Sequence, residues 1–392
     1  MAGRYTRDVN AAIAANYDAL GFIGNPAPVL DPERLVGMAS LFGPTSWPRD
    51  VLDLGCGDGA QLQRAAGKVD GRLVGTDISV TGCTKAREGL AAWGDRVDVR
   101  CADLLDVDPD SLGQFDLIYN IGVIYITPVE VQRRVVELIG RCLRPGGLAV
   151  ISYYAGSRPA LRSNLYALLA ATTRGMTDFA AVVAHARGQL AALSELVKDD
   201  LLLAMIKETA GLADGILFYE ALNHVFCPIQ TTALERQLQQ YGVEFAAYMR
   251  PQGTLARVTS AERAVAADVA DLLGGGYRYA LFCKRPMHGV DLGANDVWLG
   301  SDLRSEDTGD AVGARSFSQG AHTAELRNPV SIQAVQQLAN GPMAWSSILA
   351  SIDEQSTKPK AGQVSRQEAI GDLETLIDLG LVYPWRERPA DR

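Results

Sequence analysis

The sequence predicts an α/β protein with an open, doubly wound sheet that is mostly parallel. Short apolar runs alternate with helical patterns up to about residue 153, as in strands that are joined by crossover helices. Several of these runs are apolar on both faces, which a sheet covered by helices on each side requires. The 392 residues also exceed the usual size of one hydrophobic core, so we expect more than one domain.

Two helices and five strands are expected in this first part. A helix over residues 8–20 and a second one with Asp31 as its N-cap precede the first strand. The strands are predicted over residues 51–54, 72–77, 97–103, 115–122 and 147–154. Helices are expected between them, and Thr127 with Glu130 forms a capping box at the start of the last one.

The pattern changes after the fifth strand. Residues 159–227 contain long helical patterns and no convincing strand, whereas strands return at 243–250 and 277–285. Thr232 and Glu235 predict a capping box for the helix between the insert and the sixth strand. A helical insert at this point lies over the carboxyl ends of the strands, where ligands bind in such sheets, so it is a candidate lid.

The last hundred residues are expected to form a third unit. A connection rich in Gly, Asp and Ser covers residues 286–327, and three helices with a terminal strand follow, which suggests a winged-helix-like module. Asn328 caps the first of these helices, Ser365 and Glu368 begin the last, and Gly380 ends it. We therefore divide the chain into four parts. Residues 1–158 hold the first five strands with their helices, and residues 159–230 form the insert. Residues 231–285 complete the sheet, and residues 286–392 form the linker and its module.

Composition and charge limit the partners. With 47% hydrophobic and 21% charged residues the chain is ordinary for a globular protein, and its net charge of −9 offers no basic footprint for nucleic acid. No run approaches the roughly 20 apolar residues that span a bilayer. We therefore expect a cytoplasmic protein with neither a nucleic-acid nor a membrane partner. The scattered cysteines show no metal-ligand spacing, so free thiols and no metal site are expected.

Three glycines follow the first expected strand, in the order Asp53-x-Gly55-x-Gly57-x-Gly59. Gly55, Gly57 and Ala60 satisfy the loose GxGxxG/A dinucleotide pattern, which alone favours an NAD enzyme. The acid followed by alternating glycines fits better, because it resembles the first motif of class I S-adenosylmethionine (SAM) methyltransferases. In that family the glycines let the backbone approach SAM, and the acid helps to hold its ammonium group.

Further residues strengthen this resemblance. Asp77 closes the second strand, where an acid accepts both ribose hydroxyls, and Asp103 closes the third, where it can accept from the adenine amino group. The turn Pro145-Gly146-Gly147 enters the fifth strand, as is typical of these enzymes. The resemblance implies a Rossmann-like seven-stranded sheet, SAM as cofactor and S-adenosylhomocysteine (SAH) as product. The implied cofactor-binding residues are Tyr17, Asp53, Gly55, Cys56, Gly57, Gly59, Asp77, Ile78, Asp103, Leu104 and Asn120.

Nearly the whole chain is similar to bacterial class I methyltransferases with a methyltransferase regulatory domain, a family that includes protein lysine methyltransferases. The blocks that carry this likeness are Tyr17-Asp18, FDLIYNIGVIYITPVEV, LRPGGLAVISYY, ILFYEALNHVFCPI and VWLGSDLRSED. The chain departs from the family at the expected acceptor site. Ile121-Gly122-Val123-Ile124 stands where His-Gly-Val-Tyr is usual, and Ser152-Tyr153-Tyr154 stands where Ser-Tyr-Asn is usual.

Methyl transfer from a sulfonium is an in-line displacement that needs no metal, so holding the acceptor close and in line can supply most of the catalysis. A lysine amine has a pKa of about 10.4, and a closed apolar site must also favour its neutral form. The strand ends supply candidates for this work, with Asn120 as a hydrogen-bond acceptor and the tyrosines as channel lining. The predicted catalytic residues are Asn120, Tyr153, Tyr125 and His224, with Tyr119 and Tyr154 as weaker candidates and an alternative site around Tyr219 and His224.

Three functions remain open from the sequence. The first is an N-methyltransferase for an amine of a protein or peptide. The second, motivated by the altered acceptor motifs, is a small-molecule N- or O-methyltransferase of specialised metabolism. The third is a SAM-binding regulator without turnover. The tail module is expected to serve packing or dimerisation, which leaves a homodimer open.

Overall fold

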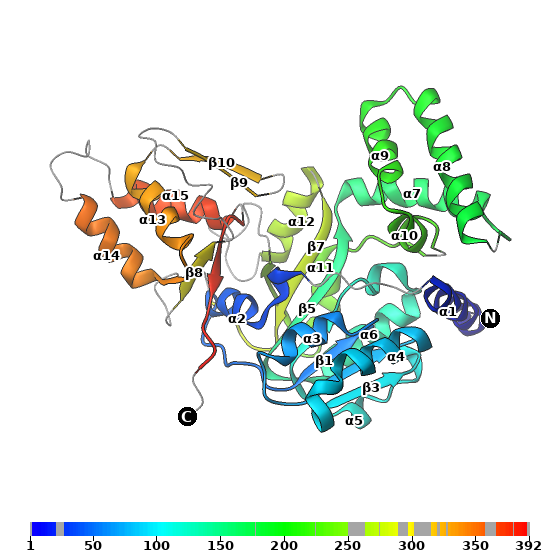
Figure 1. The fold of residues 1–392 in the computed structure, drawn as a ribbon, viewed down its shortest axis with the longest axis horizontal. Helices are drawn as coiled ribbons and strands as arrows, with labels where there is room; N and C mark the ends of the chain where they lie inside the picture. The colour runs from blue at the N-terminus through cyan, green and yellow to red at the C-terminus, as the bar shows by residue number, and fades with distance from the viewer. Residues whose placement is uncertain are drawn as a thin grey trace.

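The structure is a computed structural model, and Figure 1 shows its three parts: the sheet with its helices, a green helical insert and an orange-to-red tail. It describes residues 2–20, 27–176, 178–223, 225–249, 263–273, 275–288, 297–301, 315–319, 322–326, 328–356, 366–378 and 380–389. Within these residues no helix is both long and apolar enough to cross a membrane.

A seven-stranded sheet in the order β3-β2-β1-β4-β5-β7-β6 forms the centre of the molecule. Its strands are β1 (Val51–Leu54), β2 (Leu73–Asp77), β3 (Val97–Cys101), β4 (Phe115–Asn120), β5 (Leu143–Ala155), β6 (Glu244–Tyr248) and β7 (Gly276–Cys283). Strand β7 runs antiparallel to both of its neighbours, and the other strands share one direction. This arrangement confirms the predicted Rossmann-like sheet.

Helices cover both faces of the sheet because each has one apolar side. They are α2 (Pro32–Ser40), α3 (Ala60–Ala66), α4 (Val80–Leu90), α5 (Pro109–Leu112), α6 (Val129–Cys142), α11 (Thr231–Gln239) and α12 (Arg263–Leu273), with short helices η1 (Pro28–Leu30), η2 (Ala91–Arg96), η3 (Leu104–Asp106) and η4 (Ile124–Ile126). Helices α2, α3 and α4 contribute to one buried cluster, and α6, α11 and α12 contribute to the other. In α6 the buried residues recur with the helical period, at Val131, Val135, Leu138 and Ile139.

The capping box predicted at Thr127 is wrong, because both of its members have other partners. Helix α6 begins one residue later than expected, after Pro128 as N-cap. The hydroxyl of Thr127 donates to the carbonyl of Ile124 at 3.2 Å. Glu130 accepts from the hydroxyl of Thr6 at 2.9 Å and so ties the first helix to α6.

The box predicted at Thr232 is also wrong. Helix α11 begins after Gln230, and the Thr232 hydroxyl donates to the carboxylate of Asp268 at 2.6 Å. Glu235 accepts from the backbone N–H of Phe245 at 3.0 Å instead of capping its own helix. In both helices the glutamate of the predicted box has a tertiary partner instead.

Other predicted caps hold in part. Asp31 occupies the N-cap position of α2, but its carboxylate pairs with Arg64 rather than with the helix backbone. The prediction for Asn328 is confirmed, since its side chain accepts from the N–H of Val330 at 2.9 Å. Ser365 lies outside the described residues.

Two helical segments lie at the carboxyl edge of the sheet (Figure 1). The first is α1 (Ala2–Leu20), which is longer than predicted. The second is the insert, which consists of α7 (Ser157–Thr172), α8 (Phe179–Leu196), α9 (Asp200–Ala210), α10 (Asp214–Ile216) and the π-helix η5 (Leu217–Ala221). The insert has a small core of its own, and η5 packs against α7.

The tail packs beside α2, away from the carboxyl edge (Figure 1). Its elements are β8 (Trp298–Ser301), β9 (Arg315–Gln319), β10 (His322–Leu326), α13 (Pro329–Leu338), β11 (Met343–Ala344), α14 (Trp345–Ser356), α15 (Arg366–Asp378) and β12 (Val382–Trp385). Strands β11, β8 and β12 form a three-stranded sheet, and β9 pairs with β10. The guanidinium of Arg34 lies 3.7 Å from the ring centre of Tyr383 and joins the tail to α2.

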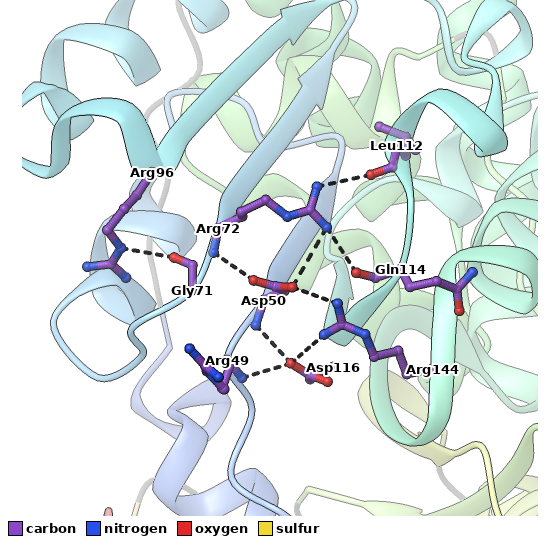
Figure 2. Close-up of polar contacts among 9 residues, drawn as sticks. All are labelled: Arg49, Asp50, Gly71, Arg72, Arg96, Leu112, Gln114, Asp116 and Arg144. Carbon is purple, nitrogen blue, oxygen red and sulfur yellow. Dashed lines mark hydrogen bonds and ion pairs between the residues drawn. The ribbon is translucent and has the colours of Figure 1, made fainter. Parts of the chain in front are cut away.

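An ion-pair network holds the amino edge of the sheet together (Figure 2). Arg144, at the start of β5, donates to Asp50 at 2.7 Å and to Asp116 at 2.9 Å. The backbone N–H of Arg72 donates to Asp50 at 2.8 Å, and its guanidinium donates to the carbonyl of Gln114 at 3.0 Å. Each acid at this edge therefore has cationic or N–H partners from neighbouring strands.

Candidate active site

A cavity of about 370 Å³ lies at the carboxyl edge of the sheet, between the strand ends and the two covering segments. The β1–α3 loop, the ends of β2 and β3, and the loop after β4 line one part of it. Helix α1, the insert and β7 line another part, with single residues from η1 and α6. Among the residues that the resemblance implies for the cofactor, those that line it are Tyr17, Asp53, Gly55, Cys56, Gly57, Asp77, Ile78, Asp103 and Leu104. The tail contributes none of its described residues.

The glycines of the β1–α3 loop have distinct structural roles. Gly55 and Gly57 line the cavity with φ values of +87° and +52°, a region that favours glycine. A Cβ atom at Gly55 would overlap the side chain of Val123, which lies on the next loop. Gly59 does not line the cavity; a Cβ there would meet Ala86 of α4 at 2.9 Å, so this glycine serves helix packing.

Asp53 is an acid without a counterion on the cavity wall. Its side chain is 2% exposed, and its Oδ1 has no hydrogen-bond partner among the described residues. Burial raises the pKa of this carboxyl to about 8, and the nearby carboxylates of Asp77 and Asp58 add to the shift. A buried acid of this kind is costly unless a cation or a donor meets it.

Asp77 is held in place by backbone donors. Its Oδ2 accepts from the N–H of Gly57 and its Oδ1 from the N–H of Ser79, both at 2.8 Å. Burial raises its pKa in spite of these hydrogen bonds. Each carboxylate oxygen keeps further acceptor capacity, so Asp77 can still receive two hydroxyl groups from a ligand in the cavity.

Helix α1 is fastened over the cofactor end by polar contacts. Asn10 donates to Asp103 at 2.7 Å, and Asp103 also caps η3 by accepting from the N–H of Leu105 at 3.0 Å. Asp18 accepts from the hydroxyl of Ser79 at 2.7 Å, next to the Asp77 loop. These contacts hold α1 against the ends of β2 and β3, where Asp77 and Asp103 lie.

The covering segments meet over the cavity. The rings of Tyr17 from α1 and Tyr219 from the insert stack with their centres 4.5 Å apart and their planes 2° apart. Both rings line the cavity. The insert therefore contributes directly to the site.

The other end of the cavity contains an acid that the sequence analysis did not single out. Glu220, on η5, accepts from the hydroxyl of Tyr125 at 3.0 Å and from that of Tyr154 at 2.9 Å. Burial raises its pKa. The ring of Tyr277 lies 5.7 Å from that of Tyr125 and 5.1 Å from that of Tyr154 between ring centres, and Phe226 packs beside both. The only sequence signal was a lone acid in the apolar run LFYEAL.

The predicted catalytic residues separate into three groups. Tyr125 lines the cavity. Asn120 and Tyr153 do not: both are fully buried, Asn120 donates to the carbonyl of Leu54 at 2.8 Å, and Tyr153 donates to the hydroxyl of Thr231 at 3.0 Å. His224 lies outside the described residues.

The two weaker tyrosine candidates also differ. Tyr119 is fully buried and donates to the carbonyl of Leu30 at 2.8 Å, so it braces the segment before α2. Tyr154, next to Tyr153 on β5, points to the opposite face of the strand and reaches Glu220. The positions of these side chains thus make Glu220 and the tyrosines around it the candidates for the acceptor end of the cavity, in place of the fully buried strand residues.

Fold and site together define the class of protein. Strand-end acids and a glycine loop at the carboxyl edge of a seven-stranded sheet with an antiparallel β7 are features of the class I methyltransferase fold. Residues 51–147 match the family model described as "Methyltransferase domain". This part of the chain is therefore a methyltransferase domain.

Individual relatives extend the comparison. An uncharacterized protein of Rickettsia prowazekii is 31% identical over 142 residues, which is 35% of this chain and 26% of that protein, and two other curated relatives are matched over 50% and 38% of their lengths. The structure of PKMT2 from Rickettsia typhi superposes with a TM-score of 0.72 at 17% identity and covers 94% of this chain and 77% of that one. The PKMT2 complex with AdoHcy gives a TM-score of 0.70 at 16% identity, again over 94% of this chain and 78% of that one. At these identities the likeness establishes the fold.

Proposed function

We propose that this protein is a SAM-dependent methyltransferase that methylates an amine nitrogen of a protein or peptide. The observation that carries the cofactor assignment is Asp53, a buried acid with an unpartnered oxygen in a cavity that also presents glycine backbone. An amino acid-type ammonium group at this point relieves the cost of burying the acid. Asp77 has acceptor capacity for the ribose hydroxyls, and Asp103 lies at the next strand end for the adenine amino group.

The residues present fit SAM at this end of the cavity. Gly55 and Gly57 present backbone on the cavity wall at positive φ, and Asp53 and Asp77 supply the acceptors. When bound, SAM supplies a methyl carbon on a positively charged sulfur, which a neutral nucleophile displaces in line. The chain's own contribution is to position both reactants and to exclude water beneath α1 and the insert.

The amine acceptor is supported by the second half of the cavity and by the neighbour in fold. The likeness in fold to PKMT2 covers 94% of this chain and therefore includes most of the insert and of the tail. An acidic and aromatic acceptor end suits a cationic amine. A small-molecule acceptor is the second candidate, because the Tyr17–Tyr219 stack covers part of the cavity and leaves less room for a protein segment.

Methyl transfer with labelled SAM tests this proposal. Purified protein is first titrated with SAH by calorimetry and then incubated with tritiated SAM and a fractionated bacterial lysate. Label in protein that survives acid precipitation supports the proposal, and label only in the extractable fraction supports the small-molecule alternative. Binding of SAH without any transfer indicates a regulator. We also expect transfer to persist in EDTA, since the displacement needs no metal.

A further inference from the structure

We propose that Glu220 receives the cationic amine of the acceptor, and that it then takes the proton that the amine must lose before it can be methylated. Tyr125 and Tyr154 hold its carboxylate, and Tyr277 forms the adjoining wall. This inference rests on the proposed function and assigns the acceptor end of the same cavity. It places the acid on the insert rather than on the strand ends.

The geometry fixes the carboxylate while leaving it able to bind. One phenol donates to each oxygen of Glu220, Tyr125 to Oε1 and Tyr154 to Oε2, which sets the plane of the group. Each oxygen keeps acceptor capacity for a further donor. Glu220, Tyr125 and Tyr277 line the cavity, whereas Tyr154 supports the carboxylate from β5. The π-helical turn that carries Glu220 is a form that occurs frequently at functional sites.

The charges around the cavity favour a cation. Its described lining includes Asp53, Asp58, Asp77, Asp103 and Glu220, with no lysine or arginine among the lining residues. The ammonium group of SAM accounts for the acid at Asp53, which lies on the glycine loop of β1. Glu220 remains as the acid at the insert side of the cavity.

Other titratable groups face Glu220 from the elements packed around it. The nearby cation is Arg162 of α7, which forms an ion pair with Glu208 at 2.8 Å and lies 5.7 Å from the ring centre of Tyr154. The phenols are those of Tyr125, Tyr154, Tyr277, Tyr17 and Tyr166. The aromatic rings give an incoming ammonium group favourable cation–π contact before it loses its proton.

The proton and the electrons balance without another reactant. The acceptor ammonium group gives one proton to the Glu220 carboxylate and becomes a neutral amine. The nitrogen lone pair forms the new nitrogen–carbon bond while the carbon–sulfur bond breaks, and that electron pair stays on sulfur. Burial raises the pKa of Glu220 and so brings it closer to that of an amine, which makes the proton transfer less unfavourable. Glu220 then returns its proton to solvent when the product leaves.

Binding of a model amine tests the assignment. The probe is N-α-acetyl-lysine methylamide, and its neutral isostere is N-α-acetyl-norleucine methylamide. Both are titrated by NMR into protein saturated with SAH. We expect wild type to prefer the amine, and Glu220→Gln to weaken amine binding at least about tenfold, as expected when a charged hydrogen bond is lost. Affinity for SAH should stay within about twofold of wild type.

A matched control separates charge from the structural role of the insert. Glu208 is an exposed acid of the same insert, and it does not line the cavity. Glu208→Gln should therefore leave amine binding unchanged within about twofold. Amine binding by wild type should also weaken as the pH falls through the raised pKa of Glu220, and Glu220→Gln should remove this dependence. The dependence should persist in Glu208→Gln.

Three results would overturn the inference. The first is a Glu220→Gln protein that keeps the wild-type preference for the amine. The second is a parallel loss of SAH and amine binding in that variant, which would show that Glu220 only closes the insert. The third is a wild type that binds SAH but does not prefer the amine, which leaves the methyltransferase proposal standing. A wild type that does not bind SAH refutes the proposed function itself, and the inference with it.

Discussion

The two edges of the central sheet treat their acids in opposite ways. At the amino edge, Asp50 and Asp116 share Arg144 and accept backbone N–H groups (Figure 2). At the carboxyl edge, Asp53 has an oxygen without a partner among the described residues. Asp77 accepts hydrogen bonds from the backbone N–H groups of Gly57 and Ser79. Asp50 precedes β1 and Asp53 lies within it, so a single short strand joins the two environments.

The pKa shifts follow this difference. Burial acts to raise the pKa of Asp50, but the hydrogen bonds from Arg72 and Arg144 and the charges of both arginines outweigh it, and the pKa is lowered. Burial raises the pKa of Asp53 to about 8, because no cation offsets it. The amino edge thus stabilises the fold by itself. At the carboxyl edge, Asp53 has no such partner among the described residues, and a bound cation can supply one.

The two acids therefore affect stability at opposite ends of the pH scale. A carboxyl whose pKa is lower in the folded than in the unfolded state stabilises the fold at pH values above its unfolded pKa. This stability is lost as the pH falls through the folded-state pKa. A carboxyl whose pKa is raised on folding has the opposite effect. As the pH rises towards 8, ionisation of Asp53 therefore lowers the free energy of unfolding, by at most about 1.4 kcal/mol for each pH unit between its unfolded and folded pKa values. Binding a cation at the carboxyl edge restores it.

The largest expected effect comes from blocking the carboxyl edge. Gly55→Val adds a branched side chain where φ is +87° and where even a Cβ atom overlaps Val123. We expect SAH binding to fall by more than about a thousandfold, roughly 4 kcal/mol, because the loop must move into the cofactor space. Calorimetric titration with SAH measures this change.

A glycine at the amino edge provides the control. Gly146 has a similar φ of +82°, but a Cβ atom there meets nothing within 4 Å. Gly146→Ala should cost some stability through backbone strain and leave SAH affinity unchanged. If Gly55→Val binds SAH as wild type does, the cofactor lies elsewhere in the cavity.

The next effect comes from removing the unpaired acid. Asp53→Asn keeps the shape and deletes the charge, so SAM should bind ten- to a hundredfold more weakly, about 1.5–3 kcal/mol. The same change should raise the stability of the ligand-free protein at pH 8, because a buried charge disappears. Urea unfolding and calorimetry on one preparation check both signs. A variant that loses stability and keeps its affinity contradicts the assignment.

The residues at the cofactor end of the cavity could be predicted from the sequence, whereas those at the acceptor end could not. The reason is local order: Asp53, Gly55 and Gly57 adjoin a strand, and Asp77 ends the next one, so the parallel sheet brings them to one edge. Any sequence with strands at these positions puts their ends together. The presence of the strands could therefore be predicted from periodicity, although β5 begins four residues earlier than the expected 147.

The acceptor end depends on contacts between distant segments. Glu220 meets Tyr125 and Tyr154 only because the insert folds back on the sheet, which no local pattern reveals. From the sequence, Tyr153 is preferred to Tyr154 as a site residue, yet strand alternation turns Tyr153 to Thr231 and Tyr154 to Glu220. Distant partners also explain why the acids of the two predicted capping boxes do not cap, since Glu130 bonds to Thr6 and Glu235 to Phe245.

Proton release on binding is a smaller effect with a definite sign. Asp53 with a pKa of about 8 is largely protonated below pH 7, and an ammonium group beside it favours the carboxylate. SAH binding near pH 7 should therefore release a proton, up to about one per site. Titrations in buffers of different ionisation enthalpy measure this number. Asp53→Asn should abolish the release, and proton uptake by wild type would contradict the raised pKa.

The smallest effect is expected at the amino edge. Arg144→Met keeps the apolar stem but leaves Asp50 and Asp116 without their shared cation. The side chain of Arg144 is 37% exposed, so solvent screens the pairs, and we expect a loss of only about 1 kcal/mol in the free energy of unfolding at pH 7.

The pH dependence of this loss identifies its cause. Because the pKa of Asp50 is lowered, its contribution is present above the usual carboxyl range and disappears as the pH falls below it. Urea unfolding should thus separate Arg144→Met from wild type at pH 7 and bring the two together near pH 3. SAH affinity should be unchanged at pH 7, since the network lies at the edge away from the cavity. A change in SAH affinity as large as that of Asp53→Asn would mean that the two edges are coupled through β1, and the division between them would fail.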